Sequence, residues 1–203
     1  STLEYIRWLG CSHVWYTGIL RHSTQTSEGG CIPSHPQFVK GKAGSPYSIM
    51  DYYDIDPDLA VNPNNRMEEF EELVARIHEK GMKVIIDFVP NHLAREYESL
   101  YKPFDVEEFG EHDNKNVIFS KDNNFYYCPD QEFEVPGQQS AASSYSEFPA
   151  KASGNDVFSA KPSVNDWYDT VKLNYGVDYQ NNNKVFEPMP NTWLKMLNIM
   201  SYW

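Results

Sequence analysis

The residues best suited to chemistry lie together at positions 87–92, which read Asp-Phe-Val-Pro-Asn-His. They follow a short apolar run at 84–86, whose β-branched residues are typical of a buried parallel strand. Barrels and open α/β folds build their sites at the C-terminal ends of such strands. The carboxylate of Asp87, the amide of Asn91 and the imidazole of His92 therefore form a predicted site.

The elements that must position this site are predicted to form a βαβ unit. Residues 12–17 (SHVWYT) are typical of a strand, and a helix is expected after Asn64-Asn65. Its apolar residues have the i, i+3, i+4, i+7 spacing of one buried face, and Gly81 would end it. That face consists of Phe70, Leu73, Val74 and Ile77. A strand over 82–88 follows, and this order predicts parallel pairing of the two strands.

Two further helices are expected at the ends of the chain. A short one would be capped by Thr2 and ended by Gly10. Another would be capped by Asn191 or Thr192 and run to Trp203. Its buried face is predicted to be Trp193, Met196, Leu197 and Met200.

Two long segments show no regular pattern. Residues 18–44 are expected to form an irregular loop. Residues 93–166 are too long for a loop in a compact domain, so we expect a small irregular subdomain inserted after the strand. Two parallel strands leave bare edges, so we expect this chain to be a piece of a larger αβ-repeat protein.

Composition excludes some classes of partner. The net charge is −12, which argues against binding nucleic acid or an anionic membrane surface. No apolar run approaches the roughly 20 residues that a membrane-spanning helix needs. Aromatic residues make up 15% of the chain, and with carboxylates and amides they suit a neutral polyhydroxyl ligand. An acidic surface that serves only solubility is equally consistent with this composition, and the compartment is left open.

Four short segments carry motifs in a fixed order. They are 11–17 (CSHVWYT), 44–57 (GSPYSIMDYYDIDP), 87–92 (DFVPNH) and 169–175 (DTVKLNY). In this order they resemble glycoside hydrolase family 13, the α-amylase family. They correspond to its second barrel strand, the loop after it, the end of its third strand and the end of its inserted domain B. The resemblance implies an α/β fold, a partial (β/α)8 TIM barrel with strands 2–3, their flanking helices and an irregular domain B.

The resemblance also implies a division of the chain. Residues 1–92 would form the N-terminal part of the barrel, 93–166 domain B, and 167–203 the return to the barrel with its third helix. The family's nucleophilic Asp, acid/base Glu and third essential Asp lie on strands four, five and seven. The alignment ends before strand four, so these three carboxylates are assigned to no residue here, and this chain alone is expected to be inactive.

Supporting roles in catalysis and substrate binding follow from the resemblance. Asp87 would orient the carboxylate network beneath the sugar, and His92 would hydrogen-bond the primary hydroxyl at the cleavage point. Tyr47 would stack on the same sugar, with Trp167 and Tyr168 as further candidates for that platform. Structural alternatives remain: a turn-capping Asp, a structural His and a core or surface Tyr. The other histidines carry no motif and are expected to be surface or structural.

A metal site is implied at Asn91, which in the family ligates a structural calcium ion. Calcium takes roughly six to eight oxygen ligands. Lys172 stands where the family has an Asp ligand, so a cationic side chain replaces a ligand at this place. This substitution argues against calcium there, although the ammonium group could replace the ion electrostatically.

The function expected from the resemblance belongs to a larger parent protein. It is a retaining glycosidase that hydrolyses α-glucosidic bonds in starch- or glycogen-type glucans or maltooligosaccharides. One alternative is an α-glucan transglycosidase of the glucanotransferase, branching or trehalose synthase type, because one fold hosts many activities. Another is a non-catalytic relative that acts as a binding or partner subunit. The last is an unrelated βαβ protein with a fortuitous hexapeptide.

Overall fold

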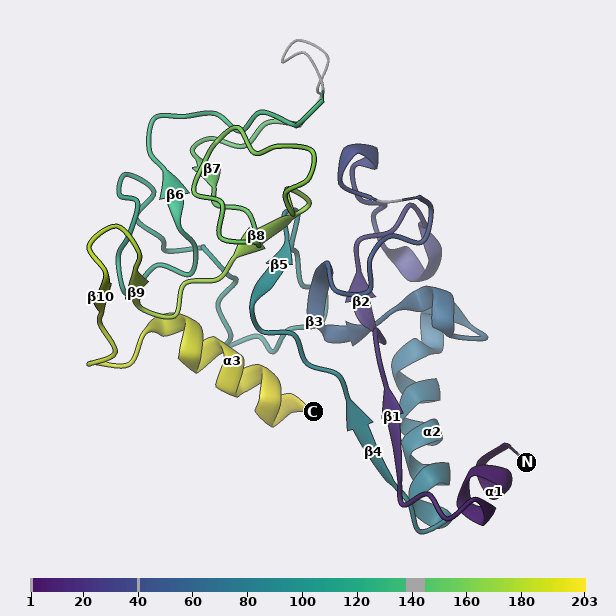
Figure 1. The fold of residues 1–203 in the computed structure, drawn as a ribbon. Coiled ribbons are helices and arrows are strands. Elements are labelled where there is room, and N and C mark those ends of the chain that lie inside the picture. Colours follow the sequence, from purple (N-terminus) through teal and green to yellow (C-terminus); the bar gives the residue numbers. More distant parts are fainter. Residues whose placement is uncertain (1, 40, 138–144) are drawn as a thin grey trace.

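The computed structural model describes residues 2–39, 41–137 and 145–203. Its helices and strands are α1 (Thr2–Trp8), β1 (His13–Tyr16), β2 (Leu20–His22), β3 (Ile49–Ile55), α2 (Arg66–Glu79), β4 (Lys83–Ile86), β5 (His92–Ala94), β6 (Tyr127–Cys128), β7 (Ala150–Lys151), β8 (Thr170–Lys172), β9 (Val177–Asp178), β10 (Asn183–Lys184) and α3 (Asn191–Tyr202). In Figure 1, β1, α2 and β4 occupy one end of the molecule, and β5 to β10 occupy the other. The strands β2 and β3 lie between these two ends.

The predicted βαβ unit is confirmed. β1 and β4 are parallel neighbours, and α2 runs alongside them (Figure 1). On the side toward α2, Tyr16, Val84 and Ile86 pack against a small core that includes Phe70. On the other side Trp15 is 63% exposed and its pair-mate Ile85 is 45% exposed. The described residues therefore form part of a barrel wall and do not close a barrel.

The helix α2 matches its predicted amphipathic pattern. Phe70 and Ile77 are buried, and Leu73 and Val74 are partly buried against the same core. The helix ends at Glu79, and Gly81 adopts φ +70°, which a residue without Cβ reaches most readily. This element was predictable because its apolar spacing alone selects one buried face.

The expected irregular segment 18–44 contains a strand that sequence reasoning missed. The strand β2 (20–22) pairs antiparallel with β3 (49–55). β3 lies within residues 44–57, which were expected to form the loop after the second barrel strand. All seven residues of β3 are buried, and both predictions were therefore wrong here. The pattern failed because Asp51 and Asp54 interrupt the apolar residues of β3. Both carboxylates are fully buried and lie beside arginines from other segments, Arg21 and Arg66.

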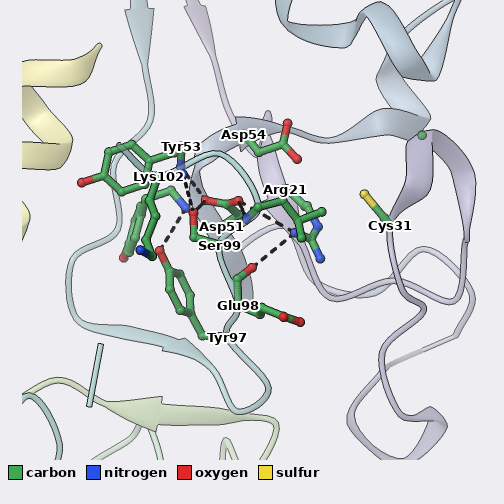
Figure 2. A network of polar contacts seen from close by, with 12 residues as sticks. Arg21, Cys31, Asp51, Tyr53, Asp54, Tyr97, Glu98, Ser99 and Lys102 are labelled. Carbon is green, nitrogen blue, oxygen red and sulfur yellow. Dashed lines mark hydrogen bonds and ion pairs between the residues drawn. The ribbon is translucent and has the colours of Figure 1, made fainter. Parts of the chain in front are cut away.

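Asp51 ties β3 to the start of the segment that follows β5. Figure 2 shows its carboxylate beside Arg21, Tyr53 and Ser99. It accepts hydrogen bonds from Ser99 Oγ at 2.7 Å, from the Leu100 amide at 2.7 Å and from the Tyr53 amide at 2.8 Å. Three donors on a buried carboxylate fix its position, so β3 and residues 99–100 form one rigid connection.

Residues 93–166 have little regular structure but a dense core. β5 pairs antiparallel with β8, which brings His92 opposite Lys172. The larger core cluster joins this segment to the β2–β3 pair and to α3; its members include Leu20, Tyr52, Leu93, Phe125, Val171, Leu173, Met196 and Ile199. In a second cluster Phe38, from the 18–44 segment, joins residues farther along the inserted segment that include Phe133, Val135 and Ala160. The inserted segment is thus packed against the β2–β3 pair and α3.

The helix α3 exists as predicted, but its buried face is different. The buried residues are Thr192, Lys195, Met196 and Ile199, whereas Trp193, Leu197 and Met200 are 42–52% exposed. Lys195 is buried because its ammonium group donates to Glu108 O at 2.6 Å and Asn124 Oδ1 at 2.9 Å. The predicted cap is also wrong: the N-cap is Pro190, and the Thr192 hydroxyl instead accepts from Asn124 Nδ2.

The helix α1 ends where predicted, before Gly10 at φ +86°. Thr2 is its first residue and not a cap, and no residue of α1 is fully buried. Across the described ranges, no helix is both long and apolar enough to cross a membrane.

Candidate functional site

A cavity of about 360 Å³ lies between the loop before β3, the start of β5 and the segment before β8. Its lining consists of Ser45, Tyr47, Ser48, Val89, His92, Trp167, Asp169 and Thr170. The cavity therefore brings together Tyr47 and His92, which the sequence pointed to from separate motifs. Trp167 joins them, whereas Tyr168 packs on Phe38 in the second core cluster.

His92 is 6% exposed, and both of its ring nitrogens are engaged. Nε2 lies 3.1 Å from the Tyr47 carbonyl oxygen, and Nδ1 lies 2.9 Å from Asn91 Nδ2. An amide nitrogen can only donate, so Nδ1 accepts and Nε2 carries the proton that it donates to Tyr47. The Trp167 ring meets the imidazole edge-on at 5.4 Å between centroids. His92 thus links the loop of Tyr47 to the far wall of the cavity.

The same surroundings keep His92 neutral. Burial lowers the pKa of His92 below its usual value of 6.5, because the charged form loses hydration. The positive charge of Lys172 also lowers this pKa. The Tyr47 carbonyl and the Asp169 carboxylate raise it, but by less. Both ring nitrogens are bonded within the protein, so a sugar hydroxyl reaches the Nε2 proton only by replacing the Tyr47 carbonyl.

Tyr47 is 45% exposed at the mouth of the cavity. Its loop is positioned by His92 and by a close approach at Gly44, which adopts φ +69°. A Cβ at Gly44 would lie 1.8 Å from the Ser23 carbonyl oxygen, so only glycine fits there. The Tyr47 ring is consequently presented to solvent by a loop whose backbone is fixed on both sides.

Asp87 follows β4 and lies beside the cavity without lining it. Its amide donates to Tyr16 O at 3.0 Å, continuing the β1–β4 ladder. Its side chain faces a smaller pocket shared with Gly18, Pro46 and Tyr47. Among the described residues its carboxylate makes no hydrogen bond or ion pair, so no backbone donor supports the alternative role of Asp87 as a turn cap.

Asn91 lies behind His92, and its amide is fully used. Nδ2 donates to Gly154 O at 3.0 Å as well as to His92. Oδ1 accepts from Lys172 Nζ at 2.6 Å, and that ammonium group lies 2.8 Å from Asp156 Oδ1. The oxygen that calcium would need is thus occupied by a cationic side chain, and this donor set does not fit a calcium ion. Within the described ranges, no group of three His, Cys, Asp or Glu residues could hold a metal.

Asp169 lines the cavity and was missed by sequence reasoning. It is 6% exposed, and its Oδ1 is buried with no hydrogen-bond partner in the described part of the chain. Asp169 opens the 169–175 motif, but the motif gave this side chain no role, because only the pairing of β5 with β8 shows that the segment lies beside His92.

Comparison with known proteins gives the chain a family. A sequence model for the α-amylase catalytic domain matches residues 1–199. The human amino acid transporter heavy chain SLC3A1 is 34% identical over 90 residues, covering 44% of this chain and 10% of that protein. Alpha-amylase 3 of Dictyoglomus thermophilum is 32% identical over 107 residues, covering 44% of this chain and 20% of that protein. The chain therefore matches about a tenth to a fifth of the length of these relatives.

A solved structure shares the fold over the whole chain. The α-amylase from Lactobacillus plantarum is similar with a TM-score of 0.53 and 23% identity, covering 100% of this chain and 30% of that one. The parallel β1–α2–β4 unit with its irregular insertion is accordingly an α/β fold, part of a TIM barrel. The chain belongs to the α-amylase catalytic-domain family of glycoside hydrolases.

Proposed function

We propose that the protein is part of a retaining glycosidase that hydrolyses α-glucosidic bonds in starch- or glycogen-type glucans or maltooligosaccharides. The observation that carries this proposal is the cavity in which Tyr47, His92 and Trp167 meet, in a chain of the α-amylase family. Aromatic faces suit pyranose rings, and a neutral imidazole suits their hydroxyl groups. Relatives named α-amylase and maltase support the same substrate class.

In this proposal each residue has a supporting role. Tyr47 stacks on the sugar. His92 holds the Tyr47 loop, and its Nε2 bonds a sugar hydroxyl when that hydroxyl replaces the Tyr47 carbonyl. Asp87 orients groups beneath the sugar, since its carboxylate is free to accept from a partner outside the described residues. The nucleophile and the acid/base group of a retaining mechanism are assigned to no residue of this chain.

We also propose the division into barrel (1–92), domain B (93–166) and return to the barrel (167–203). The junction between the first two parts is held at Asn91 by Lys172 instead of calcium. The contacts that support this are the short bonds from Lys172 Nζ to Asn91 and Asp156. In this arrangement the ammonium group supplies the positive charge and needs no metal ligands.

The test is the product pattern of the full-length protein acting on maltoheptaose, followed by chromatography. Shorter oligosaccharides alone, released first as the α-anomer, are expected for a retaining hydrolase. A mixture of shorter and longer chains would identify a transglycosidase. Unchanged maltoheptaose would contradict both enzymatic functions.

A non-catalytic role is the second candidate. It is favoured by the match to SLC3A1, which is named as the heavy chain of an amino acid transporter. For such a protein the product assay would be negative, and the protein would co-purify with a partner chain. The presence or absence of the three family carboxylates in the parent sequence discriminates between the two candidates.

A further inference from the structure

The Asp169 side chain is buried at the cavity wall, and its carboxylate has no hydrogen-bond partner among the described residues. Its Oδ1 has no hydrogen bond, and no hydrogen bond or ion pair to Oδ2 exists among the described residues. Its backbone, in contrast, is fixed, because the Asp169 carbonyl accepts from the Arg95 amide at 2.9 Å. A carboxylate that is buried without a hydrogen bond loses its hydration and gains nothing in return, which costs free energy. Such a group is rare in folded proteins unless a ligand supplies the missing donor.

Nearby side chains cannot supply the missing partner, because they are already engaged. Lys172 is held by Asn91 and Asp156, and both nitrogens of His92 are bonded. The Arg95 guanidinium is bound to the Glu147 carboxylate at 2.6 Å and to Ser153 Oγ at 3.2 Å. Oδ1 is closed off by the protein, whereas Oδ2 is not among the buried atoms, so Oδ2 is the acceptor that a molecule entering the cavity can reach.

The cavity lining limits what that ligand is. Asp169 is its only acidic side chain, and the neighbours are two serines, a threonine, aromatic rings and a neutral imidazole. One carboxylate is too few for a divalent cation, which needs several oxygen ligands. A ring with many hydroxyl donors fits this lining, since the aromatic faces take the ring and the carboxylate takes a hydroxyl proton.

We propose that Asp169 is a substrate-binding residue that accepts a hydrogen bond from a hydroxyl of the glucose unit in the Tyr47–Trp167 cavity. This inference rests on the proposed function and adds a residue to its site. Among the described residues the Asp169 carboxylate has no partner, and the sugar supplies the donor. Selectivity follows, because a sugar without that hydroxyl leaves the carboxylate unpaired.

The experiment compares the full-length protein with its Asp169→Asn variant, using maltotriose binding by calorimetry and thermal unfolding. Asn keeps the shape but removes the charge, so affinity is expected to fall about tenfold or more. The melting temperature is expected to stay equal or rise, because the variant no longer buries an unpaired charge. A lowered melting temperature would mean a structural role and would overturn the proposal.

Asp122→Asn is the matched control. Asp122 lies in the inserted segment away from the cavity lining and is 67% exposed, and its one ion pair among the described residues is with the adjacent Lys121, so both affinity and stability should be unchanged. If the unaltered protein binds maltotriose and Asp169→Asn binds equally well, the inference is wrong while the proposed function stands. If the unaltered protein binds neither maltotriose nor maltoheptaose, the proposed function itself fails, and the inference fails with it.

Discussion

At the scale of single residues, two histidines illustrate how surroundings decide charge. His92 is neutral because burial outweighs its favourable contacts. Burial is the largest single influence on the pKa of His22 and lowers it, but Asp56, with Oδ2 at 2.9 Å from Nδ1, and the Leu20 and Ala43 carbonyls together raise it by more. The pKa of His22 therefore lies above 6.5, and that of His92 lies below it.

We predict titration midpoints on opposite sides of 6.5 for these two histidines, measured by NMR on the imidazole protons. Stability follows the same signs. The contribution of His22 is complete below its unfolded pKa and is lost as pH rises through its folded pKa. That of His92 is present above its unfolded pKa and is lost as pH falls. His22→Gln should thus cost more stability at about pH 5 than at about pH 8, and His92→Gln the reverse. Equal costs at both pH values would contradict these assignments.

Lys172 allows a second test at this scale. Lys172→Met should lower the free energy of unfolding by about 1–3 kcal/mol, because it leaves Asn91 Oδ1 without its donor. Urea denaturation measures this, and a chelator should change neither protein. Lys161→Met is the control: its pair with Glu134 is largely exposed, and its loss should cost well under about 1 kcal/mol. Strong destabilisation of the unaltered protein by the chelator would show that calcium holds this junction after all.

At the scale of elements, the buried strand β3 depends on ion pairs. Arg66 donates to both oxygens of Asp54, at 2.7 and 2.9 Å, and to the Pro63 carbonyl at 2.7 Å. It is 2% exposed, and Asp54 is fully buried. The Arg66 guanidinium therefore joins the start of α2 to β3. The strand β3 directly follows the loop that carries Tyr47.

Arg66→Met is predicted to lower the free energy of unfolding by about 3–5 kcal/mol, because Asp54 would remain buried without a partner. Chemical denaturation provides the measurement. Arg76→Met serves as control, since its pair with Glu72 on the same helix is solvent-exposed and should contribute less than about 1 kcal/mol. Similar losses of unfolding free energy for both variants would mean that the Arg66–Asp54 ion pair does not hold β3 in place.

The elements also show what the sequence could predict. The helix α2 followed from apolar spacing, because Phe70, Leu73 and Val74 on its predicted face pack in an apolar core. The strand β3 and the buried face of α3 did not. Their polar residues, Asp51, Asp54 and Lys195, are buried by partners far away in the chain. Local patterns assign such residues to the surface, so only the tertiary contacts reveal the error.

At the scale of the whole molecule, the site depends on contacts between distant segments. Motif order was sufficient to indicate Tyr47 and His92, which meet in one cavity. The placement of Trp167 and Asp169 required the pairing of β5 with β8, across a segment with little regular structure. The pairing of two short strands so far apart in the chain leaves no local pattern in the sequence. The sequence therefore predicted the cavity wall with Tyr47 and His92 better than the wall with Trp167 and Asp169.

The most direct test of the account is calorimetric binding of maltoheptaose to the full-length protein and its Tyr47→Ala variant. Loss of the stacking ring should weaken binding by about 0.5–1.5 kcal/mol or more, with little change in melting temperature because Tyr47 is half-exposed. Tyr5→Ala, which removes an exposed ring on α1 that stacks on Trp8, should leave the affinity unchanged. A weaker complex for Tyr47→Ala alone would place the glucan in the Tyr47–Trp167 cavity. Equal affinities for all three proteins would contradict the site proposed for this chain.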